Sequence, residues 1–233
     1  MIPSANKFAA ILFFALLLFA TSAVAGPPLV CHGFDIGSAE SLPWISHSWN
    51  LNGSESYNLN NLVSDTTSIL DADSTVLVHM ETLRRATLYA GKDPLVAKRL
   101  LVALIARSNA AANTPAASLA TFDAGYLVET YKQYEWISKS GSDPAHNVDG
   151  YALIQKAIQL RGNGNDPQME FAAALVTLSG PAAEHTDHAQ KAKAGANTDP
   201  LLARNLATHF MSPQSETMVE MISRNSAEKV ARQ

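Results

Sequence analysis

The segment LYAGKDP, residues 88–94, decides the fold class because it carries the signals that end one helix and begin another. Glycine commonly follows the last residue of a helix, while Asp93 and Pro94 suit the capping position and the first position of the next helix. Apolar residues recur on both sides of the segment, over 83–90 and 95–106. The segment therefore predicts the turn of a helical hairpin.

The same signals recur further along the chain. Asp-Pro pairs begin at Asp166 and Asp199, each a few residues after a glycine, and the three pairs lie 73 and 33 residues apart. These spacings approximate two units and one unit of a helix-turn-helix repeat of about 34 to 37 residues. Alanine, the strongest helix former, is abundant. The sequence predicts an all-α fold built as a solenoid-like array of helix hairpins.

This pattern resembles the tetratricopeptide family of helical repeats, and the resemblance implies an array of paired helices. Residues 83–106 also align with residues 154–178 through their Asp-Pro turns. The segments 31–44 and 122–130 are similar to exported bacterial helical proteins, a resemblance that brings no activity with it.

Periodicity and capping residues predict a succession of helices over roughly 55–71, 74–90, 94–111, 115–138, 147–162, 167–179, 182–194, 200–210 and 214–231. They form an all-helical, repeat-like domain over 55–233. Residues 26–54 lack a helical or strand period but are too apolar for a disordered tail. We expect them to form an ordered, irregular N-terminal arm that packs on the helices.

The first 25 residues have the order of a secretory signal peptide. Lys7 precedes an apolar run over 8–20, and the small residues Ala23 and Ala25 suit cleavage after residue 25. The run is shorter than the roughly 20 residues that a spanning helix needs. We therefore expect a signal peptide over 1–25, export to the periplasm or the extracellular space, and a mature chain without stable membrane insertion.

The charge balance excludes some classes of partner. The net charge at pH 7 is -4, and it becomes -5 when Lys7 leaves with the signal peptide. Nucleic acids and anionic membranes attract clustered positive charge, so neither is an expected partner. Cys31 is the single cysteine, so an intramolecular disulfide cannot form and helix packing must stabilise the fold.

Cys31 and His32 are adjacent soft ligands, and His47 follows 15 residues later. A thiolate with imidazoles can bind zinc or copper, although the spaced second ligand pair typical of a tetrahedral site is missing. The same residues can pack against Trp44 and Trp49 instead, which is the more common role. The unpaired thiol can also act in redox chemistry or bond to another molecule.

His185 and His188 form a second histidine cluster, one turn apart on the helix expected over 182–194. This spacing can hold a metal ion if Glu184 or Asp187 completes the ligand shell. A polar, solvated helix face is the more common interpretation of such a pair.

Aromatic residues crowd the helix expected over 115–138, namely Tyr126, Tyr131, Tyr134 and Trp136. In an array of helices they can line a concave binding groove for a peptide or a sugar, because aromatic rings offer large contact areas with a polar tip. Core packing is the alternative for the earlier members of the set.

The basic residues of two neighbouring helices are expected to form a solvated edge. They are Arg84 and Arg85 on one helix and Lys98, Arg99 and Arg107 on the next.

Known catalytic patterns are absent from the sequence, including G-x-S-x-G, H-E-x-x-H and phosphate-binding loops. We therefore expect an exported, non-catalytic binding or scaffold protein that has a protein or peptide partner and no cofactor. The alternative is a metal-binding or redox protein that uses Cys31, His32 and His47, or His185 and His188, with zinc or copper as the metal.

Overall fold

The computed structural model describes residues 28–45, 51, 53–72, 74–141, 143–162 and 166–209. The expected signal peptide, His47 and the expected helix over 214–231 lie outside these residues. Across the described part of the chain the fold is all-α, as predicted, and contains no strand. No helix in these ranges is both long enough and apolar enough to cross a membrane.

The helices follow one another along the chain with short connections. They are α2 (Pro28–Cys31), the 3-10 turn η1 (Leu59–Asn61), α3 (Leu62–Leu70), α4 (Val76–Ala90), α5 (Pro94–Ala110), α6 (Ala117–Ser138), α7 (Gly150–Leu160), α8 (Pro167–Val176), the 3-10 turn η2 (Thr177–Ser179), α9 (Ala182–Ala196) and α10 (Pro200–His209). The first long helix begins later than predicted. Asn58 accepts a hydrogen bond from the Asn60 N–H at 3.1 Å and holds a turn there, so regular helix starts only afterwards.

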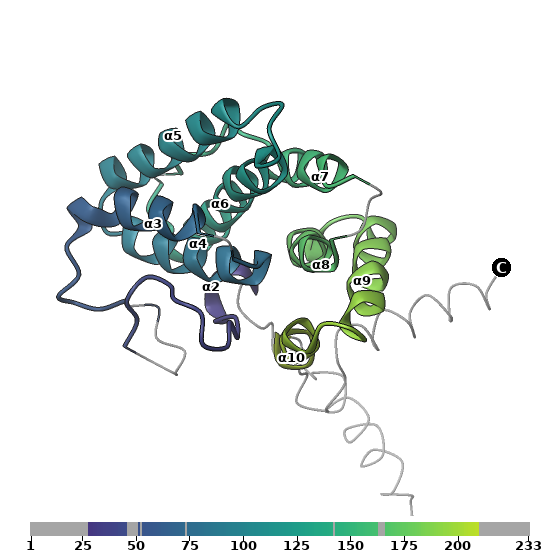
Figure 1. Cartoon of the computed structure of the whole chain (residues 1–233). Coiled ribbons are helices and arrows are strands. Elements are labelled where there is room, and N and C mark those ends of the chain that lie inside the picture. The colour runs from purple at the N-terminus through teal and green to yellow at the C-terminus, as the bar shows by residue number, and fades with distance from the viewer. Residues whose placement is uncertain are drawn as a thin grey trace, which may run out of the picture.

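Figure 1 shows α3 to α6 gathered on one side of the molecule and α8 to α10 on the other, with α7 beside α6. Helix α6 contacts α4, α5 and α7, and α8 contacts α4, α6, α7 and α9. Neighbouring helices therefore pack on one another, which is consistent with an array of hairpins, while a regular solenoid remains a prediction.

The Asp-Pro pairs at Asp93, Asp166 and Asp199 begin helices as predicted. Asp93, Asp166 and Asp199 each accept hydrogen bonds from two backbone N–H groups in the first turn of the helix that follows, at 2.8 to 3.4 Å. A proline occupies the first position of each helix, where no N–H donor is needed. Local capping chemistry thus sets where α5, α8 and α10 start.

Gly91 follows the last residue of α4, as predicted, whereas Gly195 does not follow its helix. Gly91 follows α4 in a right-handed conformation with φ of −59°, and Gly195 lies inside α9 rather than after it. A Cβ atom on Gly91 would overlap the ring of Tyr134, and one on Gly195 would overlap the ring of Pro167. Glycine is needed at these two positions because neighbouring segments approach the backbone closely.

Helix α4 is the central element. All of its residues except Arg85 are buried, and it contacts α2, α3, α5, α6 and α8. The predicted solvated basic edge is therefore wrong for Arg84, which is 4% exposed. The Nε atoms of Arg84 and Arg85 lie 2.7 and 2.6 Å from the carboxylate of Glu81, because a charge on a helix covered from all sides requires an internal partner.

Replacing Gly195 by alanine should destabilise the fold. The added methyl group overlaps Pro167 at the start of α8, and we expect a loss of roughly 1 to 3 kcal/mol in the free energy of unfolding, measured by denaturant titration. Pro167→Gly in the same chain removes both the Cβ and the Cγ atom that the methyl group overlaps, and relative to Pro167→Gly alone the Gly195→Ala change should then cost much less. A control, Ala194→Val at the exposed neighbouring position, should have a smaller effect, and equal losses at 194 and 195 would contradict the assignment.

Candidate functional site

The carboxylate of Glu81 on α4 is the centre of the most connected polar cluster. Besides both arginines of its own helix, it accepts a hydrogen bond from the backbone N–H of Phe34 in the arm at 2.9 Å. Burial alone would raise the pKa of Glu81, but the hydrogen bonds and charges of Arg84 and Arg85 outweigh it, and the pKa is lowered. The side chain is therefore an anion that joins α4 to the arm.

Side chains from three helices bind the backbone of the arm over residues 28–45. These six residues, which we call the arm groove, are Glu81, Arg84, Arg85 and Tyr89 on α4, Gln133 on α6 and Asn205 on α10. They donate to or accept from backbone groups of Leu29, Val30, Phe34, Asp35, Leu42 and Pro43 at 2.5 to 3.2 Å. Peptide N–H and C=O groups occur in every polypeptide, so the groove recognises the path of the segment more than its sequence.

Apolar side chains of the arm fill the space between these hydrogen bonds. Leu29, Val30 and Leu42 have no exposed surface, and Phe34 is also buried. Trp44 lies edge-on to the ring of Tyr89, with the guanidinium of Arg84 5.0 Å from its ring centroid. The arm is thus held by alternating apolar burial and backbone hydrogen bonds.

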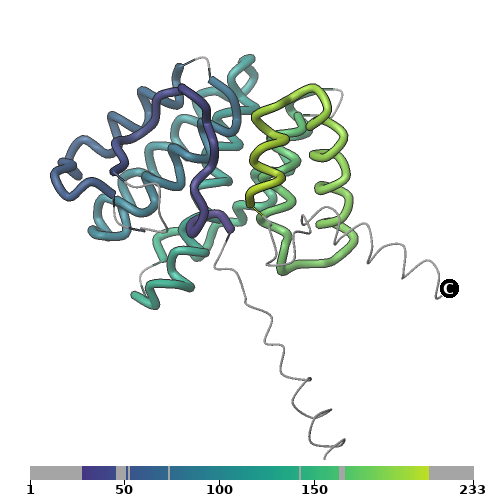
Figure 2. The backbone as a smooth tube through the Cα atoms, turned by 90° about the horizontal axis from the view of Figure 1, so that it is seen from below, coloured from purple at the N-terminus to yellow at the C-terminus, as the bar shows by residue number. Residues whose placement is uncertain are grey.

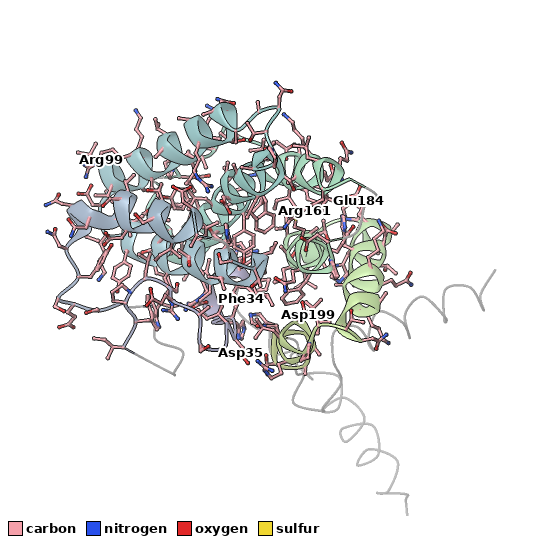
Figure 3. All side chains as sticks on the ribbon, viewed as in Figure 1. Phe34, Asp35, Arg99, Arg161, Glu184 and Asp199 are labelled. Atoms are coloured by element: carbon pink, nitrogen blue, oxygen red, sulfur yellow. The ribbon has the colours of Figure 1, made fainter. Side chains whose placement is uncertain are left out.

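The arm also contacts the last described helix, as Figure 2 shows where the purple arm runs beside α10. Asn205 accepts from the Asp35 N–H at 2.9 Å and donates to the Asp35 carbonyl at 2.8 Å. Arg204 pairs with the Asp35 carboxylate at 2.7 Å. Phe34 and Asp35 lie between α2 and α10 in Figure 3.

His209 at the end of α10 is enclosed by aromatic rings. It stacks on Phe34 with centroids 4.3 Å apart, and it meets the edges of Phe171 and His32 at 5.8 and 5.9 Å. Burial, followed by the charge of the neighbouring His32, lowers the pKa of His209 to about 4. Burial and then the charge of Arg84 also lower the pKa of His32, so both rings are neutral at pH 7.

The structure describes two of the three residues of the first predicted metal cluster. Cys31 is half-buried in α2, His32 lies against His209, and His47 is outside the described residues. Burial raises the pKa of the Cys31 thiol, which disfavours the thiolate form that metals and redox reactions require. In the ranges that the structure covers, no group of three His, Cys, Asp or Glu side chains is placed to hold one metal ion.

The second histidine cluster is buried, so its interpretation as a solvated face is wrong. His185 donates from Nδ1 to the Ala174 carbonyl at 2.8 Å, and His188 Nδ1 lies 2.5 Å from Glu170 Oε2. Both imidazoles point from α9 onto α8 because the two helices pack closely along their length. Burial lowers the pKa of His185, which keeps that ring neutral.

Tyr151 completes a chain of three polar groups with Glu170 and His188. Its hydroxyl lies 2.8 Å from His188 Nε2, so a carboxylate orients an imidazole that contacts a phenol. In nucleophilic catalysis such an imidazole removes a proton from the attacking group. Burial and then the charge of Glu184 raise the pKa of Tyr151, however, so the phenol retains its proton and the chain joins α7, α8 and α9.

The predicted aromatic groove is distributed between core and surface. Tyr126 and Tyr131 are buried, and the Tyr131 hydroxyl bonds to the Ala97 carbonyl at 3.1 Å. Tyr134 is half-buried and packs over Gly91, whereas Trp136 is 67% exposed. Only the last two residues of the set therefore reach the surface.

A cavity of about 460 Å³ lies where the starts of α4, α8 and α10 meet. Most of its charged and amide side chains are engaged with one another, whereas the buried Ser74 hydroxyl has no hydrogen-bond partner among the described residues. Gln168 accepts from the Leu77 N–H at 2.9 Å and donates to Asp199 at 2.6 Å, and Arg161 pairs with Asp166 at 3.0 Å. These bonds join the ends of helices, so the side chains around the cavity serve to hold those helices together.

The chain matches no protein-family model, and no curated protein or solved structure matches it. The functional inference therefore depends on the geometry of the described residues. Among them, the arm groove is the surface that already binds a polypeptide segment. The sequence contained one signal of the arm groove. Glu81 lies three and four residues before Arg84 and Arg85, a spacing typical of ion pairs within a helix.

Removing members of the Glu170–His188–Tyr151 chain should have graded effects on stability. His188→Ala leaves the buried Glu170 carboxylate with only Lys191, 3.7 Å away, and should lower the free energy of unfolding by roughly 3 to 5 kcal/mol. Tyr151→Phe removes one hydrogen bond and should lower it by about 1 kcal/mol.

Asp187→Ala is the matched control for these two variants because it removes an exposed partner of Lys191, and it should change stability by less than about 1 kcal/mol. Denaturant unfolding measures all three. A loss for Tyr151→Phe as large as that for His188→Ala would show that the phenol has more than a supporting role.

Proposed function

We propose that this chain is an exported, non-catalytic binding protein whose helices bind an extended peptide segment of a partner. One observation carries the proposal: six side chains of the arm groove already bind a polypeptide segment through its backbone. In the described state the occupant is the chain's own arm. A partner segment binds by replacing it.

The arm is helical only over Pro28–Cys31, and the distribution of apolar and polar contacts along it supports binding to a segment that is extended over most of its length. Leu29, Val30, Phe34 and Leu42 are buried between the helices, and hydrogen bonds to the backbone lie between them. Peptide-binding proteins commonly combine backbone bonds for affinity with pockets for selected side chains. A partner segment would place three or four apolar side chains at similar intervals.

The state of the reactive side chains supports a non-catalytic role. Burial raises the pKa of both Cys31 and Tyr151, so neither becomes a nucleophile at neutral pH. Glu81 and Glu170 are committed to pairs with Arg84 and His188. The ionisable groups discussed here thus hold helices and arm together.

The arm's own sequence provides a defined probe for the groove. A fluorescent peptide of residues 28–45, with Cys31 replaced by serine, should bind the mature chain 26–233 weakly because the resident arm competes. Leu42→Ala in the chain weakens the resident arm and leaves the groove intact, so peptide affinity should rise at least about tenfold, given the roughly 2 to 5 kcal/mol that such a truncation removes.

Glu40→Ala, at an exposed position of the same arm, is the matched control and should leave peptide affinity unchanged. Bound peptide should also displace the arm and increase chemical labelling of Cys31. A Leu42→Ala chain that stays folded but does not bind the peptide, or that binds it with Cys31 still protected, would contradict a shared groove.

Export rests on residues 1–25, and the proposal predicts a defined product. Expression of residues 1–233 in a bacterium should yield a periplasmic or secreted protein that begins at Gly26, measured by intact mass. A protein retained in the cell with residues 1–25 attached would contradict the export proposal and leave the groove proposal to be judged by peptide binding.

A further inference from the structure

The junction of the arm with α10 contains two imidazoles in a largely apolar enclosure. His209 lies between the rings of Phe34 and Phe171, and His32 meets its edge. A positive charge on the buried His209 ring loses most of its hydration here, and one on the half-buried His32 ring loses part of it. The neutral form of the imidazole is therefore more stable in this junction than the protonated form.

We propose that acidification releases the arm and α10 from the rest of the helices, with protonation of His209 as the trigger. The release opens the arm groove. This inference concerns the chain's own arm, so it stands whether or not a partner segment occupies the groove afterwards.

Two ionisable groups act on His209 through their charge. The arm contributes His32, and α4 contributes Glu81, whose carboxylate pairs with Arg84. Arg84 also acts on His32, while Asp35 of the arm and Arg204 of α10 pair with each other. On α8 the neighbouring group is the uncharged ring of Phe171.

The charge of Glu81 favours a protonated His209, as do backbone hydrogen bonds with His32 and Asn205, but these effects are together weaker than those of burial and of His32, so the pKa of His209 is lowered. Its carboxylate is already shared between Arg84, Arg85 and the Phe34 N–H. Once protonated, His209 and His32 would add two cations close to Arg84. Neutralising that cluster requires water, which enters only if the junction opens.

The direction of the pH dependence follows from proton uptake. Released His209 takes up a proton near its ordinary pKa of 6.5, whereas docked His209 takes one up only at a pKa of about 4. Between these values release consumes a proton, so the docking equilibrium weakens by up to about tenfold per pH unit as the pH falls. Above pH 6.5 neither state is protonated and docking is independent of pH.

Protonation of two further groups also favours release of the arm, at lower pH. The hydrogen bond from Arg204 lowers the pKa of Asp35, and the arginines of α4 lower that of Glu81, so both stabilise docking as anions. Their contributions are lost only as the pH falls through those lowered pKa values. The first stage of release therefore belongs to the histidines.

Cys31 is a native reporter because it is the only cysteine and lies in the arm. Its labelling rate with dithiodipyridine, which reacts with thiols in acid, is measured on mature chain 26–233 from pH 7 to about pH 4.5. Each rate is divided by that of the unfolded chain at the same pH, which removes the effect of thiol ionisation. We expect protection of Cys31 to fall at least about tenfold, while helix content by circular dichroism stays nearly constant.

His209→Phe retains a ring between Phe34 and Phe171 but cannot take up a proton, so protection should change less than about twofold over the same range. His209→Gln is a second unprotonatable variant in case the phenylalanine disturbs packing. His146→Phe, at an exposed histidine, should behave as the unmodified chain.

Constant protection in the unmodified chain would overturn the inference. An equal loss of Cys31 protection in the unmodified chain and in both His209 variants would also overturn the inference. Loss of protection only together with loss of helix content would show general acid unfolding instead of release.

Discussion

The buried carboxylate of Glu81 is the constraint on which the rest of the structure depends. It binds Arg84 and Arg85 from its own helix and the Phe34 N–H from the arm. The two arginines then reach carbonyl groups of the arm with their remaining donors. Because a buried anion needs all of these partners, the central helix and the arm depend on each other for a satisfied core.

The same arrangement recurs at other places in the core. Asp123 on α6 binds His79 on α4 at 2.6 Å and Arg107 on α5 at 2.7 Å. Glu170 on α8 binds His188 on α9. Each of these buried carboxylates connects different helices, so the polar groups constrain how the helices align where small apolar side chains would permit sliding.

The sequence predicted those features that depend on neighbouring residues. Asp93 and Asp166 cap helices because their partners lie two and three positions away, and the all-α class follows from such local signals. Burial of Arg84 depends instead on Val30, 54 residues earlier, and burial of His188 depends on Glu170 across a hairpin. Periodicity carries no information about such pairings, which is why both were expected on solvated faces.

The contact between Asp35 and Asn205 joins positions 170 residues apart. The arm is synthesised long before its partner on α10, so this contact cannot form until residue 205 has been made, although the arm can already dock on α4 and α6. The order in which the ribosome makes the chain thus delays enclosure of the arm until α10 has been made.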